Sequence, residues 1–132
     1  MNTHVKLLMV VLSAVGVVVC GCKTSQPGVT NSLGTLETLV EATPQAVTSA
    51  TTEALKELDM VIISSKADKL CGQVIARTPE DTKVTVTMEP RPNNLTMVNV
   101  RSGAMGNAAL SQRIIDKIKM KLYTQPPTPL VR

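Results

Sequence analysis

The sequence is almost without aromatic side chains and has a single histidine. Trp and Phe are absent, Tyr123 is the sole aromatic residue, and His4 is the sole imidazole in 132 residues. Aromatic rings are needed to stack sugars or single-stranded bases, so binding sites of that kind are excluded. The formal net charge is only +4, and we therefore expect no nucleic-acid partner.

The N-terminus has the pattern of a secretory signal. Lys6 precedes an apolar run from Leu7 to Val19, and Gly21-Cys22 follows it. The run is shorter than the ~20 apolar residues that a membrane-spanning helix needs. A positive start, a short apolar core and a small residue before the cleavage point are typical of a signal peptide. A plain secretory signal and an anchor helix are the alternatives.

A cysteine directly after the expected cleavage point resembles the signal of bacterial lipoproteins. The stretch Val19-Cys20-Gly21-Cys22 has a small residue before the second cysteine, whose thiol would carry the lipid. We predict that residues 1–21 form a lipoprotein signal peptide and that Cys22 is the lipid attachment site. Several acyl chains would hold the protein at the membrane, facing the periplasm. Lys23, in place of Asp, favours the outer membrane if the cell has one.

Cleavage before Cys22 would remove most of the catalytic chemistry. It takes away His4 and Cys20, and loss of Lys6 lowers the formal charge from +4 to about +3. Without an imidazole, Ser-His-Asp and Cys-His pairs and His-ligated zinc are excluded, and we expect neither metal nor cofactor. Cys71 is left without an internal disulfide partner. We interpret it as a small apolar residue in a strand, the alternatives being a reactive thiol or an intermolecular bridge.

The rest of the chain divides into three segments. Residues 22–34 are rich in Ser, Thr, Gly, Pro and Asn, and this composition predicts a flexible tether. Residues 35–123 carry the periodic apolar patterns of one folded domain. Residues 124–132, with three prolines, are predicted to be a disordered tail.

Within the domain, apolar periodicity predicts two helices and four or five strands. Thr43-Pro44 is a favourable helix start, and apolar residues then recur at helical spacing to residue 58. The last helix is expected after a cap at Asn107, with an apolar face of Leu110, Ile114, Ile115, Ile118 and Leu122. Strands are expected over residues 35–41, 60–64, 70–77, 83–89 and 95–102.

The clearest strand pattern is the alternation at residues 83–89. Val84, Val86 and Met88 are expected to face a core, while the Thr-rich opposite side faces water. The element order β-α-β-β-β-α predicts an α+β domain, in which an antiparallel sheet carries both helices on one face.

The segment Val98 to Asn107, followed by Ala109-Leu110-Ser111 and the helix Arg113 to Ile118, resembles a family of small bacterial lipoproteins of unknown function. The resemblance covers about Leu36 to Leu122. Asn107 stands where an acidic residue is usual in that family, and Met105 where an aromatic is common. The resemblance implies an α+β domain and a membrane location, and it implies no activity.

Arg101, Gly103 and Gly106 form one candidate site. The following helix N-terminus offers free amides, so these residues together are a candidate anion or partner contact. The alternative, which we favour, is that the glycines permit a sharp turn and that Arg101 pairs with Glu89 across the sheet.

Arg113, Lys117 and Lys121 form a second candidate, a basic stripe at four-residue spacing that would meet anionic lipid or an acidic partner. The favoured alternative is a solvated helix face. Glu80 and Asp81 are adjacent carboxylates, but they fall in a predicted turn where acidic residues are common.

The composition and these patterns favour a non-enzymatic envelope lipoprotein that binds or braces another envelope component. The membrane is its expected partner through the lipid, together with an envelope protein or anionic lipid. The alternative is a small envelope enzyme, either a hydrolase or a thiol-dependent enzyme.

Overall fold

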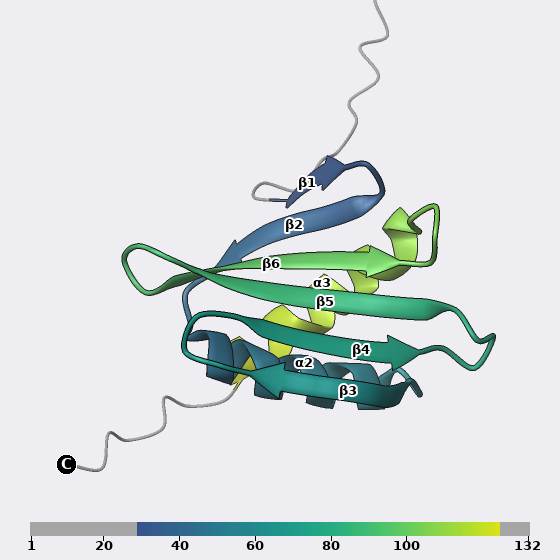
Figure 1. Cartoon of the computed structure of the whole chain (residues 1–132), viewed down its shortest axis with the longest axis horizontal. Coiled ribbons are helices and arrows are strands. Elements are labelled where there is room, and N and C mark those ends of the chain that lie inside the picture. Colours follow the sequence, from purple (N-terminus) through teal and green to yellow (C-terminus); the bar gives the residue numbers. More distant parts are fainter. Residues whose placement is uncertain (1–28, 125–132) are drawn as a thin grey trace, which may run out of the picture.

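The computed structural model describes residues 29–124 as one antiparallel sheet with two helices (Figure 1). The predicted signal peptide, Cys22 and residues 125–132 lie outside the described residues. The strands are β1 (Val29–Ser32), β2 (Thr35–Val40), β3 (Val61–Ala67), β4 (Gly72–Arg77), β5 (Lys83–Arg91) and β6 (Leu95–Ser102), and the helices are α2 (Pro44–Glu57) and α3 (Ala108–Thr124).

The strand order is β1-β2-β6-β5-β4-β3, and every neighbouring pair is antiparallel. The predicted α+β class and the order β-α-β-β-β-α are confirmed. The sheet has six strands, one more than the upper expected number. The additional strand, β1, pairs with β2 and is formed by residues 29–32 of the segment that the sequence predicted to be a tether.

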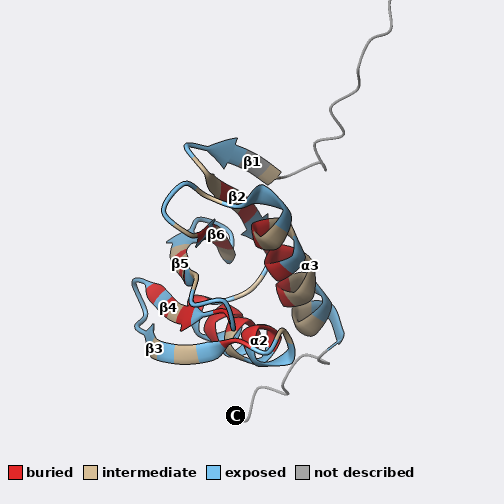
Figure 2. Cartoon of the chain, turned by 90° about the vertical axis from the view of Figure 1, so that its right-hand side faces the viewer, coloured by how far each residue is buried: buried red, intermediate tan, exposed pale blue. Residues whose placement is uncertain are grey.

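Both helices pack on the same face of the sheet (Figure 2). Alternate residues of the central strands point into this layer, among them Val74, Val86 and Val100, all fully buried. Helix α2 contributes Val47, Ala54 and Leu55 and helix α3 contributes Ile114, Ile115 and Ile118 to the same core. The alternation predicted for β5 is therefore confirmed, as is the apolar face of the last helix.

Helix α2 begins as the sequence predicts. The Thr43 hydroxyl accepts a hydrogen bond from the Ala46 amide at 3.3 Å, and Pro44 occupies the first turn, where its missing N–H costs nothing. The helix ends at Glu57, one residue before the expected end. Within it, the Thr48 hydroxyl donates to the Pro44 carbonyl at 2.8 Å, which allows this polar side chain to be buried.

The region of β3 and β4 differs from the prediction. Strand β3 starts at Val61 and continues to Ala67, and a bulge interrupts its pairing with β4 between Ile62 and Ser64. A bulge shifts the alternation of a strand by one residue. For this reason the strand predicted over residues 60–64 ends before the observed strand does. Strand β4 starts at Gly72, so Cys71 precedes it and is exposed. The interpretation of Cys71 as a strand residue is therefore wrong.

Helix α3 begins at a side-chain cap and is joined to β6 by a hydrogen bond between side chains. Asn107 caps the helix, because its side-chain oxygen accepts from the Leu110 amide at 3.1 Å. The buried hydroxyls of Ser102 and Ser111 share a hydrogen bond of 3.0 Å.

Over residues 29–124, no helix has the length and apolar character needed to cross a membrane.

Candidate functional site

The glycine loop between β6 and α3 brings Arg101, Gly103 and Gly106 close together, as expected. Polar groups of the loop, however, already form hydrogen bonds with other groups of the protein. The Gly103 amide donates to the Lys83 carbonyl at 2.8 Å, and the Asn107 amide donates to the Ser102 carbonyl at 2.9 Å. The Arg101 guanidinium donates to the Ala104 carbonyl at 2.7 Å. These bonds stabilise the turn and occupy amides that an anion would need.

Arg101 does not pair with Glu89. In the sheet register Arg101 lies opposite Thr85 on β5 and Thr35 on β2. Glu89 lies opposite Met97 and forms an ion pair with Arg91, with 3.2 Å between their charged atoms. The predicted Arg101–Glu89 pair is wrong because the register places Arg101 beside the start of β5, whereas Glu89 lies toward its end.

Gly106 has a structural role that the sequence did not predict. A Cβ at this position would lie 2.3 Å from the carbonyl oxygen of Gly34, well inside the van der Waals limit. The backbone of the β6–α3 loop therefore contacts the backbone of the turn between β1 and β2. The pair of glycines is the only signal in the sequence for this contact, and nothing in their spacing indicates that they meet.

The basic stripe on α3 is partly neutralised by α2. Lys117 lies 3.3 Å from a carboxylate oxygen of Glu57, and Lys121 forms a second ion pair with the same carboxylate. The hydrogen bonds from Lys121 and Lys117 hold the pKa of Glu57 below its ordinary value of 4.5. The bond to Glu57 raises the pKa of Lys121 above 10.5. Arg113 is exposed on the same helix and takes no part in this cluster.

The sheet face opposite the helices presents a row of polar side chains. The register aligns Glu37, Asn99, Thr87, Gln73 and Lys66 across five strands. We call these five residues the polar row. All are at least partly exposed, although the side-chain oxygen of Asn99 is buried and has no hydrogen-bond partner within residues 29–124.

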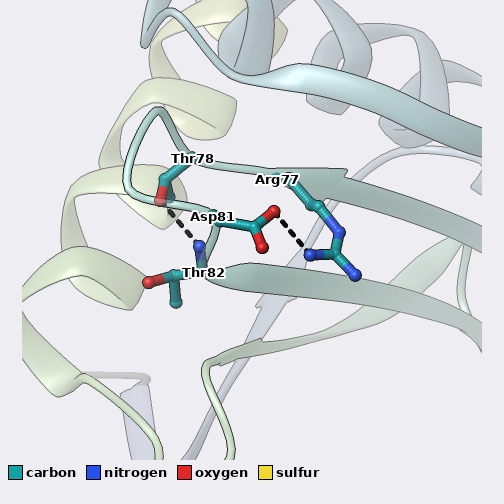
Figure 3. Close-up of polar contacts among 4 residues, drawn as sticks. All are labelled: Arg77, Thr78, Asp81 and Thr82. Carbon is teal, nitrogen blue, oxygen red and sulfur yellow. Dashed lines mark hydrogen bonds and ion pairs between the residues drawn. The ribbon is translucent and has the colours of Figure 1, made fainter.

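The Glu80-Asp81 pair has the local role that the sequence favours. Figure 3 shows the Asp81 carboxylate beside the Arg77 guanidinium, 2.5 Å apart, and the Thr82 amide donating to the Thr78 hydroxyl at 3.1 Å. Glu80 and Asp81 are both exposed. These contacts close the turn between β4 and β5, and the two carboxylates do not face each other across a cleft.

An open groove of about 470 Å³ lies between α2 and β3, lined by Gln45, Thr48, Ser49, Thr52, Glu53, Lys56, Ser65 and Ala67. Its lining is mostly short hydroxyl and amide side chains, with one carboxylate and one ammonium group. No group of three or more His, Cys, Asp or Glu residues suited to a metal ion occurs within residues 29–124.

A family model described as a protein of unknown function (DUF3568) matches residues 1–121 of the chain. The match therefore includes the whole described sheet and almost all of α3. A search of curated proteins finds no match.

Proposed function

We propose that this chain, which belongs to the DUF3568 family of proteins of unknown function, is a lipid-anchored protein of the cell envelope. Cys22 is the anchored residue, and the domain that follows is a non-enzymatic binding or structural module. In a cell with two membranes, the outer membrane is the proposed location.

The observation that carries this proposal is the small number of residues in the sequence between Cys22 and the first strand. Strand β1 begins at Val29, seven residues after Cys22. Cys22 follows a short apolar run and a small residue, and cleavage before it would make it the first residue of the chain. The folded domain would then begin only a few residues after the lipid. This spacing suits a domain that works close to a membrane.

The polar row supports the binding part of the proposal. Its residues lie on strands β2 to β3, on the sheet face opposite the two described helices, whose position Figure 2 shows. Polar side chains aligned across a sheet present several hydrogen-bond donors and acceptors on one surface, which favours contact with an extended polar partner. Such a face can brace an envelope component without any chemical step.

Labelling with radioactive palmitate tests the anchor. The Cys22→Ala variant should lose the label and keep its signal peptide, while Cys20→Ala and Cys71→Ala should remain labelled. Cys20 is the matched control because it lies only two residues away in the same apolar context. A labelled Cys22→Ala chain, or a label that depends on Cys20, would overturn the proposal.

A further inference from the structure

Two loops at one end of the sheet each present a large apolar side chain to solvent. Leu33 lies in the turn between β1 and β2, and Met105 lies in the loop between β6 and α3, at the right-hand end of the sheet in Figure 1. Each side chain is 92% exposed. Single exposed apolar residues are common on proteins, so the significance of these two depends on how their loops are built.

Leu33 occupies a backbone conformation that leucine disfavours. It has φ +49° and the next residue, Gly34, has φ +79°, and two positive φ values in a two-residue hairpin define a type I′ turn. Asn, Asp and Gly suit such positions because an ordinary side chain crowds the backbone there. Elsewhere within residues 29–124, every residue with positive φ is Asp, Asn or Gly. Leu33 therefore combines an unfavourable backbone with an unfavourable exposure.

The two loops are held against each other. A Cβ on Gly34 would lie 2.6 Å from the Met105 carbonyl oxygen, and a Cβ on Gly106 would lie 2.3 Å from the Gly34 carbonyl oxygen. Only glycines permit this approach. The contact fixes Leu33 and Met105 at a common end of the molecule before any partner binds, and we call these two residues the apolar tip.

Two cations without a carboxylate partner among the described residues lie at the same end of the sheet as the apolar tip, as do the exposed Glu80 and Asp81 of the turn between β4 and β5. Arg101 precedes Met105 by four residues, and the Lys83 carbonyl accepts the Gly103 amide of the same loop. Both cationic side chains are exposed. Within residues 29–124, neither forms an ion pair with a carboxylate. Apolar side chains flanked by such cations match the interface of an anionic bilayer, where acyl chains lie beneath negative headgroups.

We propose that the apolar tip inserts into the surface of the membrane that holds the lipid anchor, with Lys83 and Arg101 against anionic headgroups. This inference rests on the proposed function, because the anchor keeps the domain beside a bilayer. The seven residues from Cys22 to Val29 reach at most ~25 Å when extended. Strand β1 adds only about 13 Å between Val29 and the tip, so the tip lies within reach of the anchored membrane.

Tryptophan fluorescence tests the insertion, because the chain has no Trp of its own. The full lipidated chain carrying Met105→Trp is reconstituted into vesicles of phosphatidylethanolamine and phosphatidylglycerol. We expect its emission to shift to shorter wavelength and to be quenched by brominated acyl chains. Leu33→Trp is the second probe, and it places the ring on the other loop of the tip.

Leu70→Trp is the matched control. Leu70 is 81% exposed but precedes β4, at the opposite end of the sheet (Figure 1). Its emission should remain that of a ring in water, and brominated lipid should leave it unquenched.

The outcomes separate this inference from the proposed anchor. If the Met105→Trp and Leu33→Trp probes both remain in water on a lipidated chain, the inference is overturned and the anchor stands. Emission shifts of all three probes together, without quenching by brominated lipid, point to a protein contact or aggregation and also overturn it. A Met105→Trp chain that carries no lipid but is quenched in vesicles supports insertion and refutes the anchor. A chain without lipid and without quenching refutes both.

Discussion

Replacing Leu33 by Asn should make the protein more stable, although no contact is gained. Leu33 lies at φ +49° with 92% of its side chain exposed, so its removal loses almost no packing. An L-residue with an ordinary side chain is disfavoured in the left-handed region by about 1–2 kcal/mol, and asparagine relieves part of this cost. Asn-Gly is also the preferred pair for a type I′ turn. We expect a gain of about 1 kcal/mol in the free energy of unfolding.

Urea denaturation of the full chain, followed by circular dichroism, measures this gain. The midpoint should rise while the slope stays the same, and about 1 kcal/mol should raise the melting temperature by roughly 4–8 °C in a domain of this size. Leu70→Asn is the control, because Leu70 is also exposed but has no positive φ. It should leave stability nearly unchanged. A Leu33→Asn chain that is less stable than the parent would mean that the leucine side chain packs within the fold, and the argument for the apolar tip would fail.

Two further predictions concern loop and helix contacts. Gly106→Ala should lower the free energy of unfolding by about 2 kcal/mol or more, because the added Cβ meets the Gly34 backbone. Gly103→Ala, whose Cβ would lie 3.4 Å from Thr82, should cost only about 1 kcal/mol, and equal losses in the two variants would contradict the loop contact. The Glu57 pKa is lowered by Lys121 and Lys117, so the ion pairs stabilise the fold above pH 4.5 and this contribution is lost as pH falls through the folded-state value. Glu57→Gln should therefore flatten the acid side of a melting temperature measured against pH, and an unchanged acid side would refute this role.

Strands β5 and β6 could be predicted from the sequence because they lie in the middle of the sheet. On each strand the core-facing residues, such as Val86 and Val100, are fully buried and the residues between them are at least partly exposed, so the alternation of buried and exposed positions follows from the place of the strands in the sheet. Strand β3 is at the edge and carries a bulge, and its alternation is therefore irregular. Strand β1 has only four residues, VTNS, whose composition cannot be told from that of a linker. Its strand conformation depends on pairing with β2.

Prediction of the candidate sites was limited because sequence patterns indicate contacts between residues that are close in the chain. They do not indicate contacts between residues that are distant in the chain. Helical spacing places Lys117 and Lys121 on one face of α3, and the sequence predicts that much. The acidic partner, Glu57, is 60 residues before Lys117 and reaches it only because α2 and α3 pack side by side. Gly34 and Gly106 are a similar case. Each glycine permits a turn locally, while their contact depends on the position of the hairpin beside β6.

The short strand β1 links the proposed anchor to the proposed site of insertion. The chain enters β1 at Val29 and reaches Leu33 directly after its last residue, so β1 lies between the proposed anchor and the proposed site of insertion. Insertion of the tip at the end of the sheet places the strands at a steep angle to the bilayer. The polar row crosses the strands near the middle of the sheet. In this orientation it would run roughly parallel to the membrane surface, and its side chains would point away from the sheet and not toward the bilayer. A domain held in this orientation keeps its uncovered sheet face out of the headgroups and open to a partner in the envelope.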